Sequence, residues 1–179
     1  MTVHTIAETR AGRRRAGIAA ASGLLTALIG LAPLTAATTA IADPAPIVVA
    51  QNRATGQTTD HNLARDYYGQ CTWGAYEKFH EHTGLWPLIG GNAKDMNDNA
   101  AARGWTVVLD AEPRSLVVFE PGVHGADPNY GHVGWVDEVF IENGVKKIRI
   151  TETNAGGALG EFTTRVLPDV VGMSYILAP

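Results

Sequence analysis

The sequence has one cysteine, Cys71, and this shortage limits what the protein can be. A single cysteine cannot form an intramolecular disulfide, so the fold must rest on a hydrophobic core. In an exported chain, which the N-terminus indicates, a lone thiol is buried and inert, paired with another molecule, or reactive. Only the third alternative makes the protein a cysteine enzyme.

Basic patches are also scarce. The chain has 14 basic and 18 acidic residues; residues 43–179 keep 10 and 17 of them, a formal charge of −7. Nucleic-acid binding normally requires a basic stripe or run, so we expect no nucleic-acid partner. Clustered metal ligands are missing too, because no further ligand accompanies His80, His82 and Glu77. We therefore expect no metal and no cofactor.

The N-terminus has the layout of a secretory signal. Four arginines precede an uncharged Ala/Leu-rich stretch over residues 16–33, and the small residues Ala40 and Ala42 follow. This order is typical of a signal peptide, and we expect cleavage after Ala42. A membrane would become a partner only if this apolar segment stayed uncleaved.

Three segments divide the chain. Residues 1–42 are the expected signal peptide, residues 43–65 a polar linker or N-terminal arm with a short strand at Ile47–Val49, and residues 66–179 one domain. No internal repeat or second domain is visible, and the length suits a single core. We expect a monomer.

Helices precede strands in this domain. A helix is expected from Gln70 to about His82, with an apolar face spaced three or four residues apart and Gly84 after its end. A second helix is expected over residues 92–103. Strands are then predicted at Trp105–Leu109, Leu116–Glu120, His132–Ile141, Val145–Asn154 and Met173–Leu177. Helices followed by short strands predict an α+β domain with an antiparallel sheet.

Cys71 begins the first helix, where exposed N–H dipoles favour the thiolate form of its side chain. The backbone N–H of Cys71 and the side-chain amide of Gln70 could together form an oxyanion hole. A nucleophilic thiol also needs an imidazole base. His132 is the candidate, because it opens a strand, whereas His80 and His82 lie roughly 14–17 Å away along the helix axis.

The following strand carries the candidate orienting groups, Glu152 and Asn154, at positions that continue an apolar face. A carboxylate on the core side of a sheet needs a partner. A two-residue turn at Asn143-Gly144 would put His132 and Glu152 on opposite faces unless a bulge compensates. A three-residue loop, Glu142–Gly144, would put them on one face and pair His132 with Asn154. The catalytic interpretation therefore predicts the three-residue loop.

These residues resemble the CHAP family, the cysteine, histidine-dependent amidohydrolases/peptidases related to the papain-like NlpC/P60 enzymes. The motifs occur in family order and are Gly69–Trp73, Gly91–Asp95, Val117–Gly122, Gly131–Val136 and Thr151–Asn154. Two departures concern turn and groove shape: Arg114-Ser115 replaces a usual Gly-Asp, and Met96 stands where an aromatic residue is common.

The resemblance implies a papain-like CHAP fold, with N-terminal helices packed on an antiparallel β-sheet. It implies that Cys71 is the nucleophile, His132 the general base and then acid, Glu152 the group that orients the imidazole, and Asn154 an auxiliary polar group. It also implies a secreted or cell-wall peptidoglycan hydrolase that cleaves amide bonds, as an endopeptidase or an N-acetylmuramoyl-L-alanine amidase.

Three aromatic residues, Trp73, Tyr130 and Trp135, are candidates to line the substrate groove, although each also suits a core or rim position. Two other functions remain open. The protein could be a non-catalytic secreted module of the same fold that binds cell wall or protein, or a secreted cysteine peptidase that acts on protein.

Overall fold

A computed structural model describes residues 52–179 of the protein. The expected signal peptide at residues 1–42 and the expected strand at Ile47–Val49 lie outside the described residues, so both stay predictions. Within residues 52–179, none of the helices combines the length and the apolar character that crossing a bilayer requires.

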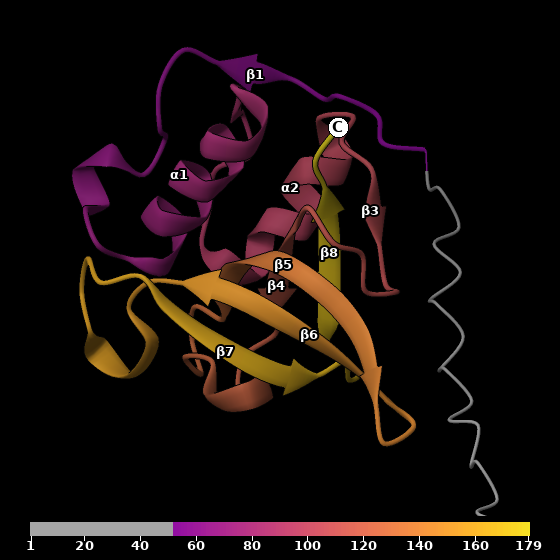
Figure 1. Cartoon of the computed structure of the whole chain (residues 1–179). Helices are drawn as coiled ribbons and strands as arrows, with labels where there is room; N and C mark the ends of the chain where they lie inside the picture. Colours follow the sequence, from indigo (N-terminus) through magenta and orange to yellow (C-terminus); the bar gives the residue numbers. More distant parts are fainter. Residues whose placement is uncertain (1–51) are drawn as a thin grey trace, which may run out of the picture. The chain divides into compact units, whose positions relative to one another are not determined.

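Two helices and a six-stranded antiparallel sheet make up most of the domain (Figure 1). The helices are α1 (Cys71–Thr83) and α2 (Met96–Ala102). In spatial order the sheet strands are β3 (Val107–Val108), β8 (Met173–Leu177), β4 (Ser115–Phe119), β5 (His132–Glu142), β6 (Val145–Glu152) and β7 (Thr163–Pro168). A separate two-stranded pair joins β1 (Thr58–Thr59) to β2 (Trp86–Pro87). The α+β class with an antiparallel sheet is confirmed.

Helix α1 begins and ends where its sequence predicts. Gln70 has extended backbone angles before the first turn, and Gly84 after the last turn takes a left-handed φ of 73° that allows its N–H to bond the His80 carbonyl. The residues buried on the core face are Gly74, Ala75, Tyr76 and Phe79. The second predicted helix is divided into a 3₁₀ turn, η2 (Ala93–Asp95), and α2.

The sheet separates two hydrophobic clusters. Side chains on one face pack against both helices; they include Leu116, Val118, Val133 and Trp135. Their neighbours along the strands point to the opposite face and form the second cluster, which includes Val117, Phe119, Val136, Ile148 and Ile150. This alternation is the period of two that a strand imposes. Both faces of the central strands are therefore buried.

The turn between β5 and β6 corrects the predicted loop. Glu142 pairs with Val145, so the connection has two residues, and Asn143 and Gly144 both have positive φ (52° and 76°). This geometry suits the right-handed twist of a hairpin. The predicted three-residue loop is wrong.

A bulge restores the register that the three-residue loop was expected to supply. Val136 pairs with Ile150 but Glu138 pairs with Arg149, which leaves Asp137 as an extra residue in β5. Asp137 instead accepts a hydrogen bond from the Thr151 hydroxyl at 2.8 Å. The bulge returns His132 and Glu152 to the same face of the sheet.

The segment 52–65 is not the loosely packed arm that its polar composition predicts. Asn62 and Ala64 are buried, and β1 pairs with β2. Arg53 donates hydrogen bonds to the carbonyl oxygens of Arg114 and Ala178, both at 2.8 Å. The segment therefore packs on the domain near its start, through Arg53, and near its end, through Asn62 and Ala64.

Candidate active site

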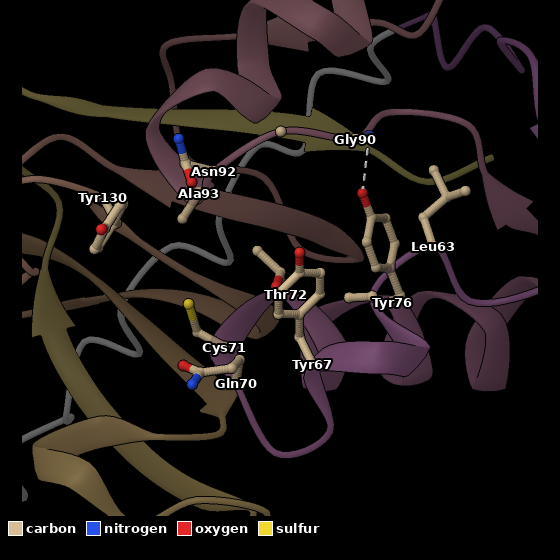
Figure 2. Close-up of a pocket in the computed structure, with 12 residues that line it drawn as sticks. Leu63, Tyr67, Gln70, Cys71, Thr72, Tyr76, Gly90, Asn92, Ala93 and Tyr130 are labelled. Atoms are coloured by element: carbon tan, nitrogen blue, oxygen red, sulfur yellow. Dashed lines mark hydrogen bonds between the residues drawn. The ribbon is translucent and has the colours of Figure 1, made fainter.

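Cys71 lies at the N-terminus of α1, half-buried, and lines a pocket of about 620 Å³. Figure 2 shows Cys71 and Gln70 on one side of this pocket, with Asn92 and Tyr130 across from them. Because Cys71 occupies the first helical position, its side chain lies at the end of α1 where the N–H groups of the first turn have no partner within the helix. This placement is the one that the sequence predicts.

The start of α1 is fixed to the end of β6. The hydroxyl of Thr153 donates a hydrogen bond of 2.8 Å to the carbonyl oxygen of Gln70, which also accepts from the Gly74 N–H. This close approach requires glycine at position 74, because a Cβ there would lie 2.3 Å from the Thr153 hydroxyl oxygen. The contact brings Glu152, the residue next to Thr153, close to the helix terminus that carries Cys71.

His132 and Glu152 form a buried pair. The Nε2 atom of His132 lies 2.8 Å from Oε2 of Glu152, with 9% of His132 and 1% of Glu152 exposed. Gly134, two residues after His132 on β5, leaves space for the Glu152 side chain, since a Cβ at position 134 would lie 3.3 Å from the Glu152 Cβ. The structure therefore brings together the two groups that the sequence singles out on neighbouring strands.

The surroundings of His132 determine its charge. Burial by itself lowers the pKa of His132, but interactions with Cys71 and then with Glu152 outweigh burial and raise the pKa to about 9. The imidazole is therefore mostly protonated at neutral pH. Because Nε2 faces Glu152, Nδ1 is the ring nitrogen left for the sulfur of Cys71. A protonated imidazole between a thiol and a carboxylate is the arrangement that stabilises a thiolate.

Arg165 is a site residue that sequence reasoning missed. It lies on β7, a strand that was not predicted, opposite Ile150 of β6. Its guanidinium contacts both oxygens of Glu152: Nε bonds Oε1, and Nη2 bonds Oε2 at 2.9 Å. Burial raises the pKa of Glu152, but the bonds from His132 and Arg165 dominate and lower it below its ordinary value. Glu152 is thus held as a carboxylate between two cations.

Asn154 does not pair with His132 as predicted. It has a left-handed φ of 57° just beyond β6, and its Nδ2 donates a 2.7 Å hydrogen bond to Oε1 of Gln70. Oε1 of Gln70 faces Asn154 in this bond, which leaves the Nε2 amino group of Gln70 outside it. Asn154 therefore contacts the predicted oxyanion-hole residue rather than the imidazole.

The family model of the CHAP domain matches residues 61–154, which include Cys71, His132 and Glu152. The chain belongs to the CHAP domain family. The resemblance inferred from the sequence motifs is thereby confirmed.

Three staphylococcal proteins are similar to this CHAP domain. An N-acetylmuramoyl-L-alanine amidase domain-containing protein of Staphylococcus aureus is 35% identical over 111 residues, 61% of this chain and 17% of the relative. An N-acetylmuramoyl-L-alanine amidase of Staphylococcus saprophyticus is 30% identical over 109 residues, 61% of this chain and 31% of the relative. A crystal structure of an N-acetylmuramoyl-L-alanine amidase from Staphylococcus aureus matches with a TM-score of 0.54 and 33% identity, over 62% of this chain and 30% of the other. This chain spans less than a third of each relative.

The three predicted groove aromatics of the CHAP domain occupy different environments. Tyr130 is 59% exposed and lines the Cys71 pocket. Trp73 is half-buried and packs between Tyr68 and Phe162, with ring centroids 4.5 and 5.7 Å away. Trp135 is 1% exposed and belongs to the core, so its predicted place in the groove is wrong. An aromatic residue in the middle of β5 faces the helices instead of solvent.

Of the residues that the structure describes, His61, His80, His82 and His124 do not line the Cys71 pocket. His80 stacks on Trp86 at 4.0 Å, and His82 stacks on Trp135 at 4.6 Å, both at the far end of α1. His61 lies beside Asp60. Over residues 52–179 the structure places no three His, Cys, Asp or Glu side chains close enough to hold a metal ion.

Proposed function

We propose that the protein is a secreted peptidoglycan hydrolase that cleaves an amide bond with Cys71 as nucleophile. The observation that carries the proposal is the buried His132–Glu152 pair at the N-terminus of the helix that bears Cys71. Three chemically different groups, a thiol, an imidazole and a carboxylate, converge from α1, β5 and β6. This combination suits acyl transfer, in which a nucleophile, a proton carrier and an orienting group must lie in line.

The reaction proceeds in two halves. The Cys71 thiolate attacks the carbonyl carbon of the scissile amide, and a tetrahedral oxyanion forms. As the C–N bond breaks, the His132 imidazolium gives its proton to the leaving amine, and a thioester between substrate and Cys71 remains. Neutral His132 then accepts a proton from water, whose oxygen attacks the thioester. The carboxylic acid product leaves, and the thiolate–imidazolium pair is restored.

Gln70 and the first turn of α1 stabilise the oxyanion in both halves. The backbone N–H of Cys71 is one donor, and the Nε2 amino group of Gln70, oriented by Asn154, is the other. Removing one such donor typically lowers kcat by about 10²–10³-fold. Asn154 therefore acts on the reaction through Gln70, and Glu152 acts through His132.

The relatives' names favour the bond between N-acetylmuramic acid and L-alanine, because each is called an N-acetylmuramoyl-L-alanine amidase. The relatives are much longer than this chain, so cleavage within the peptide stems or cross-links remains the second candidate. The signal-like N-terminus would deliver either activity to the cell wall. The exposed ring of Tyr130 supplies an apolar surface for the substrate beside Cys71.

Digestion of isolated peptidoglycan tests the proposal. The purified protein should lower the turbidity of the suspension, and Cys71→Ala should lower the rate at least about 1,000-fold. Mass spectrometry of the soluble products then distinguishes a free L-alanine amine from an amine within the peptide.

The alternatives have their own signatures. Sedimentation of the protein with peptidoglycan, without loss of turbidity from wild type or Cys71→Ala, would favour a binding module. Equal loss of turbidity with both would contradict catalysis by Cys71. Cleavage of denatured casein without release of peptidoglycan fragments would favour a peptidase that acts on protein.

A further inference from the structure

The carboxylate of Glu152 has two cationic partners, although orienting an imidazole requires only one hydrogen bond. Its side chain is completely buried and is contacted by His132 from β5 and by Arg165 from β7. A neutral amide would be sufficient to accept one hydrogen bond from an imidazole. A buried carboxylate instead carries a full negative charge, and only the imidazole of His132 separates this charge from Cys71. A buried carboxylate also needs a cation that compensates its charge.

The charges around Cys71 show why the second cation matters. A Cys71 thiolate, a His132 imidazolium and the Glu152 carboxylate together carry one net negative charge. The guanidinium of Arg165 brings the sum of the four groups to zero. An uncompensated negative charge in a buried site opposes formation of a second one. The guanidinium of Arg165 offsets the charge of Glu152, which would otherwise oppose a thiolate at Cys71.

Arg165 is held in place for this contact. It forms the two-pronged interaction with both oxygens of Glu152 that a guanidinium allows and a lysine does not. Its Nη1 also donates to the backbone carbonyl of His124 at 3.3 Å. His124 has a φ of 50°, a left-handed conformation that residues other than glycine rarely adopt. The imidazole of His124 does not contact Arg165 in this bond; its Nε2 donates a hydrogen bond to the carbonyl oxygen of Pro168.

We propose that Arg165 is a positioning residue of the Cys71 site, which neutralises Glu152 so that the Cys71 thiolate and the His132 imidazolium can coexist at neutral pH. Arg165 acts through Glu152 and touches neither the pocket nor Cys71. The inference rests on the proposed cysteine chemistry, but its test does not require that the substrate be peptidoglycan.

The rate at which iodoacetamide alkylates Cys71, measured from pH 4 to 9, reports the thiolate directly. Arg165→Gln removes the charge, Arg165→Lys keeps it without the two-pronged contact, and Arg149→Gln removes an exposed arginine of β6 that pairs with Glu138. Arg165→Gln should move the acid limb of the alkylation profile upward by roughly 1 pH unit. Arg165→Lys should move it less, and Arg149→Gln should leave it at the wild-type pH.

Hydrolysis gives the second readout. Arg165→Gln should lower kcat about 10–100-fold, with KM changed less than about twofold, because Arg165 does not line the pocket. An acid limb of Arg165→Gln that coincides with those of wild type and Arg149→Gln would overturn the proposal. So would a wild-type thiol that reacts no faster than free cysteine. The expected shift of the Arg165→Gln alkylation profile, with no release of fragments from peptidoglycan by the wild type, would reject the proposed substrate and leave the role of Arg165 intact.

Discussion

Gly74 and Thr153 are in direct contact, and this contact joins the helix that carries Cys71 to the strand that carries Glu152. A Cβ at position 74 would lie 2.3 Å from the Thr153 hydroxyl oxygen and 2.6 Å from its methyl carbon. The backbone atoms of α1 can approach β6 so closely only because residue 74 has no side chain. The distance between nucleophile and carboxylate is therefore set by a glycine that has no chemical role.

Gly74→Ala should separate the helix from the strand. We expect a destabilisation of about 1–3 kcal/mol, as for other overpacked sites, and a larger proportional loss of hydrolysis than of folded protein. Urea denaturation and turbidity assays measure the two effects. The double variant Gly74→Ala/Thr153→Ala removes the hydroxyl and methyl groups that clash, so its loss of stability should be smaller than the sum of the single losses. Strict additivity would show that the contact is not the cause.

His132 should titrate far from the ordinary range of histidine. Its pKa is raised to about 9 by Cys71 and Glu152 in spite of burial. NMR titration of the imidazole should follow a transition near pH 9 in wild type and at a lower pH in both Cys71→Ala and Glu152→Gln. A wild-type transition near the ordinary histidine pKa of 6.5 would contradict the thiolate–imidazolium arrangement.

The same pKa predicts how stability depends on pH. A group whose pKa is higher in the folded state stabilises the fold fully below its unfolded pKa and loses this contribution as pH rises through the folded pKa. The His132 contribution should thus be present below about pH 6.5 and lost by about pH 9. Glu152 behaves oppositely: its pKa is lowered, so its contribution is lost as pH falls below 4.5. Thermal melts of wild type and Cys71→Ala across pH 6–10 should diverge most at the neutral end.

The main parts of the site were predictable because they begin regular elements. Cys71 starts a helix with a recognisable terminus at Gly84, and His132 starts a strand of alternating residues. Arg165 was not predictable, since β7 is an edge strand whose side chains are only partly buried, and its register appears only once it pairs with β6. Nothing in the residues around Arg165 points to Glu152.

The hairpin shows a different limit. Asn143-Gly144 is the strongest local signal for a two-residue turn, and it is what the protein uses. The error came from assuming that β5 is regular. The consecutive charged residues Asp137 and Glu138, both exposed, interrupt the alternation and were the available sign of a bulge. Register over a long hairpin depends on such irregularities as much as on loop length.

Arg53 should be important for stability although it lies in a segment that looks like a linker. It donates to the carbonyl oxygens of Arg114, Pro113 and Ala178, and these would lose a charged donor in Arg53→Ala. We expect a loss of about 1–3 kcal/mol in urea denaturation. Arg65→Ala, at an exposed arginine whose nearest carboxylate lies 4.0 Å away, is the matched control and should change stability by less than about 0.5 kcal/mol. Equal effects of the two variants would restore the linker interpretation.

The orientation of the Gln70 amide can be tested by reversing its partner. Asn154 donates to Oε1 of Gln70, which leaves the Gln70 amino group available to an oxyanion. In Asn154→Asp the new carboxylate accepts only, so the Gln70 amide should turn its amino group toward residue 154. We expect kcat to fall about 10²–10³-fold, as much as in Gln70→Ala.

Asn154→Gly is the control for this reversal, because glycine also tolerates the left-handed φ of 57° and has no side chain with which to turn the amide. It should lower kcat only about tenfold, since Gln70 then loses its partner but can still present its amino group. If Asn154→Asp retains more activity than Asn154→Gly in turbidity assays at matched folded concentration, Gln70 does not supply the second oxyanion donor, and the backbone of α1 must stabilise the oxyanion without it.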